Sequence, residues 1–100
     1  MKGEKENGLL GDWVIDPTDY KAIREYGIVS MSFTEDGRLI YRIKSSEGTN
    51  IILLTYRVHN QGLITNQPSA PKVEKTSFAM TPEGKHILLY ADTTCRFVRA

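Results

Sequence analysis

This chain of 100 residues has a single cysteine, no long hydrophobic run and almost no net charge. Cys95 has no partner for a disulfide within the chain, so no disulfide framework can hold the fold together. No apolar run approaches the ~18 residues that a membrane-spanning helix needs. The longest apolar blocks, residues 51–54 and 87–91, have the length of strands. These absences exclude a disulfide-rich scaffold and predict no membrane span.

The charge balance is close to neutral, with 13 basic and 12 acidic side chains and a formal net charge of +1. Such a balance creates no general field that would attract nucleic acid or an anionic membrane. Arginines do alternate with aromatic residues at Arg42, Arg57 and Arg96, a pattern found on some surfaces that stack nucleic-acid bases. Residues of this kind are more often half-buried strand residues, and we expect no nucleic-acid partner.

The first eight residues are polar and charged and lack the apolar centre of a secretory signal. We therefore expect residues 1–8 to form a flexible tail and residues 9–100 to form a single domain. From the same observation we expect a cytoplasmic location. A secreted chain that had lost its signal and gained Met1 would show the same pattern.

Alternation of apolar and polar residues dominates the rest of the chain and predicts β-strands. Polar turns that contain glycine or proline separate the alternating segments at short, regular intervals. This spacing is typical of antiparallel barrels and sandwiches, and we expect a mainly β fold of about eight strands. The expected strands span residues 9–16, 28–33, 39–44, 51–58, 63–66, 73–80, 86–90 and 93–99.

One helix is expected between the first two strands, over residues 17–26. Asp16 is a suitable N-cap, Pro17 suits the first helical position, and Gly27 is a natural end. A helix of this length is not stable alone, so it must pack against the strands.

Both ends of the chain resemble the calycins, the group that contains lipocalins and fatty-acid-binding proteins. Gly11-Asp12-Trp13 resembles their Gly-x-Trp opening, and Asp19-Tyr20 followed by Gly27-Ile28 is similar to their lid helix and second strand. The segment 94–99 resembles their basic and aromatic last strand. The resemblance implies an up-and-down barrel that binds a small apolar or amphipathic ligand beneath a lid.

The chain also departs from that pattern. It is shorter, and one helix stands where the fatty-acid-binding proteins have two. In those proteins a tyrosine stands two places after the arginine of an Arg-x-Tyr motif that holds a carboxylate. Here Val98 stands two places after Arg96, so the carboxylate site does not carry over.

Barrel geometry predicts a contact between the two ends of the chain. In an up-and-down barrel the first and last strands are antiparallel neighbours, so the end of one lies beside the start of the other. Arg99 should then lie over the Trp13 ring in a cation–π contact. We expect Trp13 and Arg99 to close one end of the barrel, a structural role that the calycin resemblance also implies.

No combination of residues in the sequence predicts catalysis, a metal site or a cofactor. His59 and His86 have no common spacing and no neighbouring nucleophile, which a catalytic or zinc-binding histidine needs. Cys95 lies beside Arg96, which could activate it, but a lone cysteine on a strand is more often buried. The acidic residues Glu35, Asp36 and Glu83 occur at hairpin turns, where solvent prevents the tuning of a carboxylate pKa. We expect no enzymatic activity.

The remaining hypothesis is a cavity inside the barrel. Met31, Phe33 and Phe97 would supply apolar walls, and Tyr41 and Tyr56 would supply hydroxyl groups to the ligand. The alternative is a protein-interaction module, such as an inhibitor, an immunity protein or a subunit, with a solid barrel or sandwich core. The segment 51–58, which is apolar on both faces, favours that alternative, and a homodimer is compatible with either hypothesis.

Overall fold

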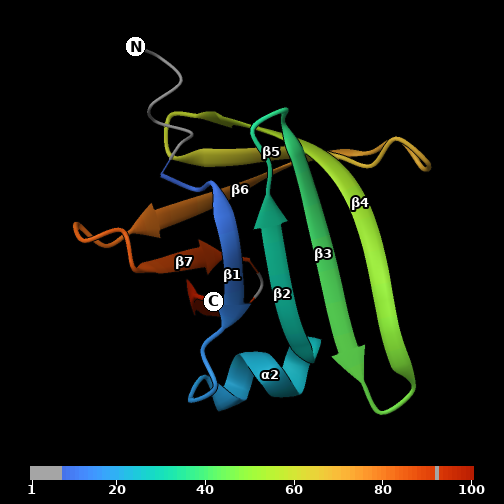
Figure 1. Cartoon of the computed structure of the whole chain (residues 1–100), viewed down its shortest axis with the longest axis vertical. Coiled ribbons are helices and arrows are strands. Elements are labelled where there is room, and N and C mark those ends of the chain that lie inside the picture. The colour runs from blue at the N-terminus through green and yellow to red at the C-terminus, as the bar shows by residue number, and fades with distance from the viewer. Residues whose placement is uncertain (1–7, 92) are drawn as a thin grey trace.

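The computed structural model describes residues 8–91 and 93–100 and forms a closed barrel of eight antiparallel strands (Figure 1). The strands follow one another around the barrel in chain order, and the last pairs with the first. The predicted mainly β barrel with one short helix after the first strand is confirmed. Residues 1–7 of the expected tail lie outside the described part of the chain. The elements are β1 (Gly11–Ile15), α2 (Tyr20–Tyr26), β2 (Ile28–Phe33), β3 (Arg38–Ser45), β4 (Gly48–His59), β5 (Gly62–Asn66), β6 (Val73–Met80), β7 (His86–Tyr90) and β8 (Thr94–Arg99).

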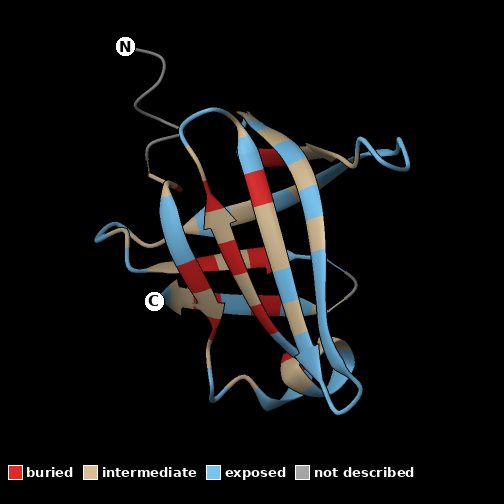
Figure 2. Cartoon of the chain, turned by 45° about the vertical axis from the view of Figure 1, so that its right-hand side comes forward, coloured by how far each residue is buried: buried red, intermediate tan, exposed pale blue. Residues whose placement is uncertain are grey.

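Strand alternation sets which side chains enter the barrel. In β2, Val29, Met31 and Phe33 are buried, whereas the intervening serines lie on the outer face (Figure 2). The hairpin that joins β2 to β3 turns at Gly37, whose φ of +84° lies in the left-handed region that favours glycine. A glycine within an acidic turn sequence is therefore the signal from which the turn at this position is predicted.

Trp13 occupies the centre of one end of the barrel, which we call the closed end. Its side chain is 0% exposed, and its Nε1 donates a hydrogen bond to the Leu9 carbonyl at 2.9 Å. Met31 pairs with Trp13 on the neighbouring strand, and Leu39 is equally buried on β3. Tightly packed apolar side chains therefore fill this end of the barrel.

Arg99 lies over the Trp13 ring, with its Cζ 4.1 Å from the ring centroid, because the two residues are register partners in β1 and β8. The guanidinium also donates hydrogen bonds to the carbonyls of Gly8 and Leu10. Gly11 makes room for it, since a Cβ atom there would lie 3.0 Å from the Arg99 Nη1. Arg99 thus joins the last strand to the segment that precedes β1.

The helix begins later than the sequence indicates, at Tyr20 instead of Pro17, and the predicted N-cap at Asp16 is wrong. Asp19 is the N-cap, and its side chain accepts a hydrogen bond from the Ala22 N–H at 3.3 Å. The Asp16 carboxylate instead accepts hydrogen bonds from the backbone N–H and the hydroxyl of Thr18. This local turn competes with helix formation over the first three expected residues.

The strand pairs do not extend along the whole length of the barrel. β4 pairs with β3 from Gly48 to Thr55, but it pairs with β5 only over Thr55–His59. Likewise, β6 pairs with β7 only from Ser77 onward. The barrel wall is therefore incomplete at the end opposite Trp13, where α2 lies beneath the strands (Figure 1). We call this the helix end.

Within residues 8–91 and 93–100, no helix has both the length and the apolar character needed to cross a bilayer.

Candidate functional site

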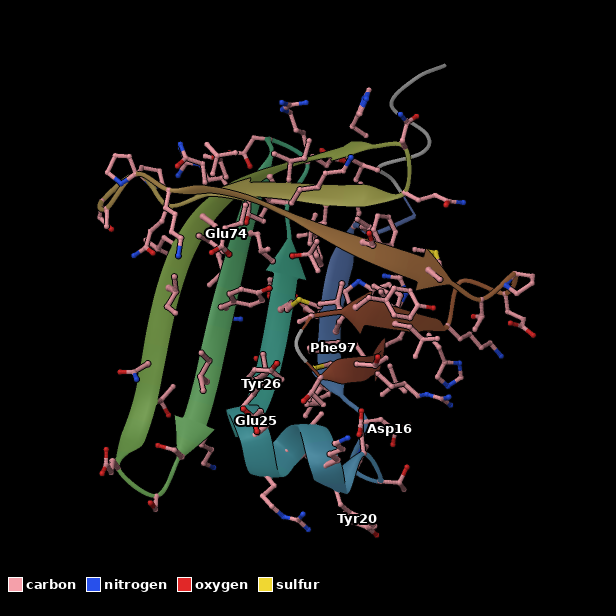
Figure 3. The ribbon with its side chains drawn as sticks, turned by 180° about the vertical axis from the view of Figure 1, so that it is seen from behind. Asp16, Tyr20, Glu25, Tyr26, Glu74 and Phe97 are labelled. Carbon is pink, nitrogen blue, oxygen red and sulfur yellow. The ribbon has the colours of Figure 1, made fainter. Side chains whose placement is uncertain are left out.

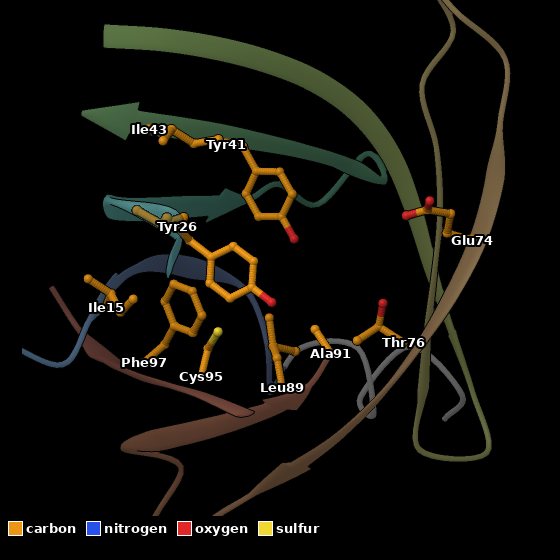
Figure 4. Close-up of a pocket in the computed structure, with 11 residues that line it drawn as sticks. Ile15, Tyr26, Tyr41, Ile43, Glu74, Thr76, Leu89, Ala91, Cys95 and Phe97 are labelled. Carbon is orange, nitrogen blue, oxygen red and sulfur yellow. The ribbon is translucent and has the colours of Figure 1, made fainter. Parts of the chain in front are cut away.

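A cavity of about 250 Å³ occupies the helix end of the barrel (Figure 4). It lies between α2, the second half of β3, the beginning of β6 and the turn between β7 and β8. Most of its lining is apolar. The lining residues are Ile15, Tyr26, Val29, Tyr41, Ile43, Glu74, Thr76, Leu89, Ala91, Cys95 and Phe97.

The floor of the cavity consists of buried apolar side chains from four strands. Ile15 on β1 and Val29 on β2 belong to the hydrophobic core, as do Leu89 on β7 and Phe97 on β8. Each points inward by strand alternation. The cavity therefore ends on the same core that Trp13 fills at the opposite end of the barrel.

Two tyrosine hydroxyls are the polar groups on one side of the cavity. Figure 4 shows Tyr26 and Tyr41 with their hydroxyls pointing across the space toward β6. The Tyr26 oxygen accepts a hydrogen bond from the Thr93 N–H at 3.2 Å, so its own proton remains available for donation. Both hydroxyls can donate a hydrogen bond to a ligand in the cavity.

Burial controls the titration of the groups around the cavity. Desolvation of Tyr41, assisted by the nearby Cys95 and Glu74, raises the pKa of Tyr41 to about 12. Burial, and then the carboxylate of Asp19, raises the pKa of the Cys95 thiol. At neutral pH the tyrosine is therefore a neutral hydrogen-bond donor. The thiol, which donates to the Thr93 carbonyl, is a poor nucleophile.

Glu74 lies at the rim of the cavity on β6, away from Tyr26 at the end of α2 (Figure 3). Its carboxylate forms an ion pair of 3.1 Å with Lys72, and both side chains are largely exposed. A second cavity of about 260 Å³ adjoins the first, since Tyr41, Glu74 and Thr76 line both. Its other lining residues include Gln67, Thr65 and Lys72, which make it more polar.

The structure brings together two of the five predicted ligand-binding residues, Tyr41 and Phe97. Met31 and Phe33 are buried nearer the closed end and do not line the cavity. Tyr56 packs edge-on against Phe33, with ring centroids 4.9 Å apart, and its hydroxyl donates to the Thr34 carbonyl. Alternation indicates that all five point inward, but it does not indicate how far along the barrel axis each one lies.

Sequence reasoning missed Tyr26, Glu74 and Thr76 as lining residues. Tyr26 is the last residue of the helix, where the helical pattern indicates packing but not which cavity it faces. Glu74 and Thr76 alternate with Val73 and Lys75 along β6. Each of these two pairs contains a polar residue, so the pattern does not indicate which pair faces the barrel interior. Phe78 and Met80, which continue the inward face of β6, are the signal that could have resolved this choice.

The two histidines lie apart from the cavity, on β4 and at the start of β7. His59 is exposed, and its ring Nε2 lies 3.2 Å from the Asn60 side-chain amide. Among the described residues, no group of three or more His, Cys, Asp or Glu side chains is arranged to hold a metal ion.

Comparisons of the chain with protein-family models, with curated proteins and with solved structures find no match.

Proposed function

We propose that this protein is a calycin-like barrel that binds one small apolar or amphipathic ligand in the cavity at its helix end. The observation that carries the proposal is a cavity of about 250 Å³ with a buried apolar floor and tyrosine hydroxyls on its wall. Ligand sites have this composition: mostly apolar linings with a few polar groups that orient the ligand. A filled barrel of this size would contain no such space.

The cavity volume limits the size of the ligand. About 250 Å³ equals the share of roughly eight water molecules at ~30 Å³ each. A chain of about eight carbon atoms with a small head group fits this space. Longer ligands would extend into the adjoining cavity, past Tyr41 and Thr76.

The helix α2 would act as the lid of this site. Its first turn is held to β8 by the Asp19 carboxylate, which accepts a hydrogen bond from the Arg96 N–H at 2.9 Å. Its last residue, Tyr26, is held by the Thr93 N–H. Between these attachments the helix buries Ala22 fully and packs Ile23 partly against the core. A short helix with so little buried surface can open locally and admit a ligand.

Octan-1-ol is a suitable neutral probe, because it matches the cavity in length and offers one hydroxyl to the tyrosines. Isothermal titration calorimetry should show saturable binding at one site per chain. The heat-capacity change on binding should be negative, because apolar surface of the ligand is buried. Heats that do not saturate at any accessible concentration would contradict the proposal.

A protein-interaction module is the second candidate function. The supporting observation is on the outer face of β4, where Ile51 and Leu53 are 62% and 61% exposed. Two large apolar side chains side by side on one strand face are typical of a contact surface. Native mass spectrometry separates the candidates, since a retained small molecule on a monomer favours the first and a dimer without a ligand favours the second.

A further inference from the structure

Glu74 is the one formally charged residue among the described residues that line the cavity. Its ion-pair partner Lys72 lines the adjoining cavity and not this one. Figure 4 shows the Glu74 carboxylate on the β6 side of the space. The side chains of Tyr26 and Tyr41 lie on the opposite side. A head group between them would face one carboxylate, which only accepts hydrogen bonds, and two phenolic hydroxyls, which both accept and donate them.

The carboxylate of Glu74 and the hydroxyl of Tyr41 line the same cavity, so the two groups influence each other electrostatically. Burial is the main cause of the raised pKa of Tyr41, and Cys95 and then Glu74 add to it, because a nearby negative charge disfavours a second one on the phenol. The same charge disfavours any anion that takes a position beside the Tyr41 hydroxyl. It favours a cation there by the same mechanism.

Neither of the two arginines of β8 offsets this charge. Arg99 lies over Trp13 at the closed end of the barrel. Arg96 lies between the buried Cys95 and Phe97, so its side chain leaves the strand on the outer face. There it lines a separate surface pocket with Asp16 and Asp19. A carboxylate ligand in the cavity would find no arginine among the described lining residues.

Lys72 forms an ion pair with Glu74, and this pair leaves acceptor sites of the carboxylate for a ligand. Its Nζ lies 3.1 Å from Oε2 of the carboxylate, with the lysine side chain 74% exposed. Exposed ion pairs of this kind are weak. A carboxylate accepts several hydrogen bonds, so a second ammonium group can share the Glu74 carboxylate with the lysine.

We propose that the cavity selects small amphiphiles with a protonated amine head group over those with a carboxylate head group. This selectivity rests on the ligand-binding function proposed above. The alkyl chain would pack against Val29, Leu89 and Phe97, and the ammonium would donate hydrogen bonds to Glu74 and to a tyrosine oxygen. The ligand class is a primary alkylamine or a small arylalkylamine.

Three probes of equal chain length test the selectivity: octylamine, octan-1-ol and octanoate, each titrated calorimetrically at pH 7 and low salt. The Kd of octylamine should be about three- to tenfold lower than that of octanoate, as expected for one partly exposed charge. The ratio should fall as salt is added, because exposed charges are screened.

Two variants that each remove one negative charge test whether the selectivity comes from Glu74. Glu74→Gln should bring the ratio of octanoate to octylamine Kd to about one or below. Glu83→Gln, in the β6–β7 turn at the far end of β6, should leave the wild-type ratio unchanged.

The outcomes separate the two proposals. If octan-1-ol binds and octanoate binds as tightly as octylamine or tighter, the selectivity is wrong and the ligand-binding function stands. If Glu74→Gln and Glu83→Gln change the ratio of the two Kd values equally, the proposed selectivity is also wrong, because the cause is then the overall charge of the protein. If none of the three probes binds, the ligand-binding function fails and the selectivity fails with it.

Discussion

Replacement of Trp13 by alanine is expected to lower the free energy of unfolding by about 3–5 kcal/mol. The side chain is fully buried, and the large cavity left by its removal lies in the most tightly packed end of the barrel. The substitution also removes the Nε1 hydrogen bond to Leu9 and the ring beneath the Arg99 guanidinium. Denaturant titration followed by far-ultraviolet circular dichroism measures the change.

Tyr20→Ala is the matched control, because Tyr20 is a large aromatic residue that is 69% exposed at the start of α2. Its loss should change stability by less than about 0.5 kcal/mol, as is usual for surface sites. Trp13→Phe should fall between the two, since it keeps a ring but loses the indole N–H. A change below about 0.5 kcal/mol for Trp13→Ala would contradict the description of the closed end.

Replacement of Ile43 by tryptophan is expected to weaken octan-1-ol binding by at least about tenfold, or ~1.4 kcal/mol. Ile43 lines the cavity on β3 and is only partly buried, so a larger side chain can enter the space without displacing the core. The indole would occupy volume that the alkyl chain needs. Calorimetry measures the affinity, and circular dichroism checks that the variant is folded.

Ile40→Trp is the control for this substitution. Ile40 lies on the same strand but, three residues earlier, points to the opposite face, beside Leu53 of β4. The wild-type affinity should therefore be retained. If both variants lose the same affinity for octan-1-ol, or if neither loses affinity, octan-1-ol does not bind where Ile43 lies.

The barrel itself could be predicted from the sequence because its strands alternate and its turns are short. Alternation fixes which residues of β2 and β8 are buried, and chain-order pairing then brings β8 beside β1. The proximity of Trp13 and Arg99 follows from these two facts. Among the described residues no helix follows α2, so few other arrangements of the strands were available.

The start of α2 could not be predicted, because the local signals favour a residue that is not the N-cap. Asp16 followed by Pro17 has the local pattern of a helix start, whereas the N-cap is Asp19. The choice depends on tertiary contacts, since Asp19 also accepts a hydrogen bond from the Arg96 N–H, 77 positions along the chain. Local propensity carries no information about that partner.

The candidate site could be predicted only in part for a different reason. Strand alternation has a period of two and separates inside from outside, but it contains no coordinate along the barrel axis. Met31 and Tyr41 are register partners on neighbouring strands, yet only Tyr41 reaches the cavity. Part of β4 extends beyond its pairing with β5, and part of β6 lies outside its pairing with β7; these limits depend on long-range register, which the sequence does not indicate.

The position of a bound ligand tests the central claim most directly. A methyl-resolved NMR titration of wild-type protein with octan-1-ol should shift the methyl signals of Ile15, Val29 and Leu89 in a saturable manner. The methyl signals of Leu39, buried at the closed end, should remain unchanged. Shifts confined to Ile51 and Leu53 on the outer face of β4 would contradict an internal binding site and favour the interaction surface instead.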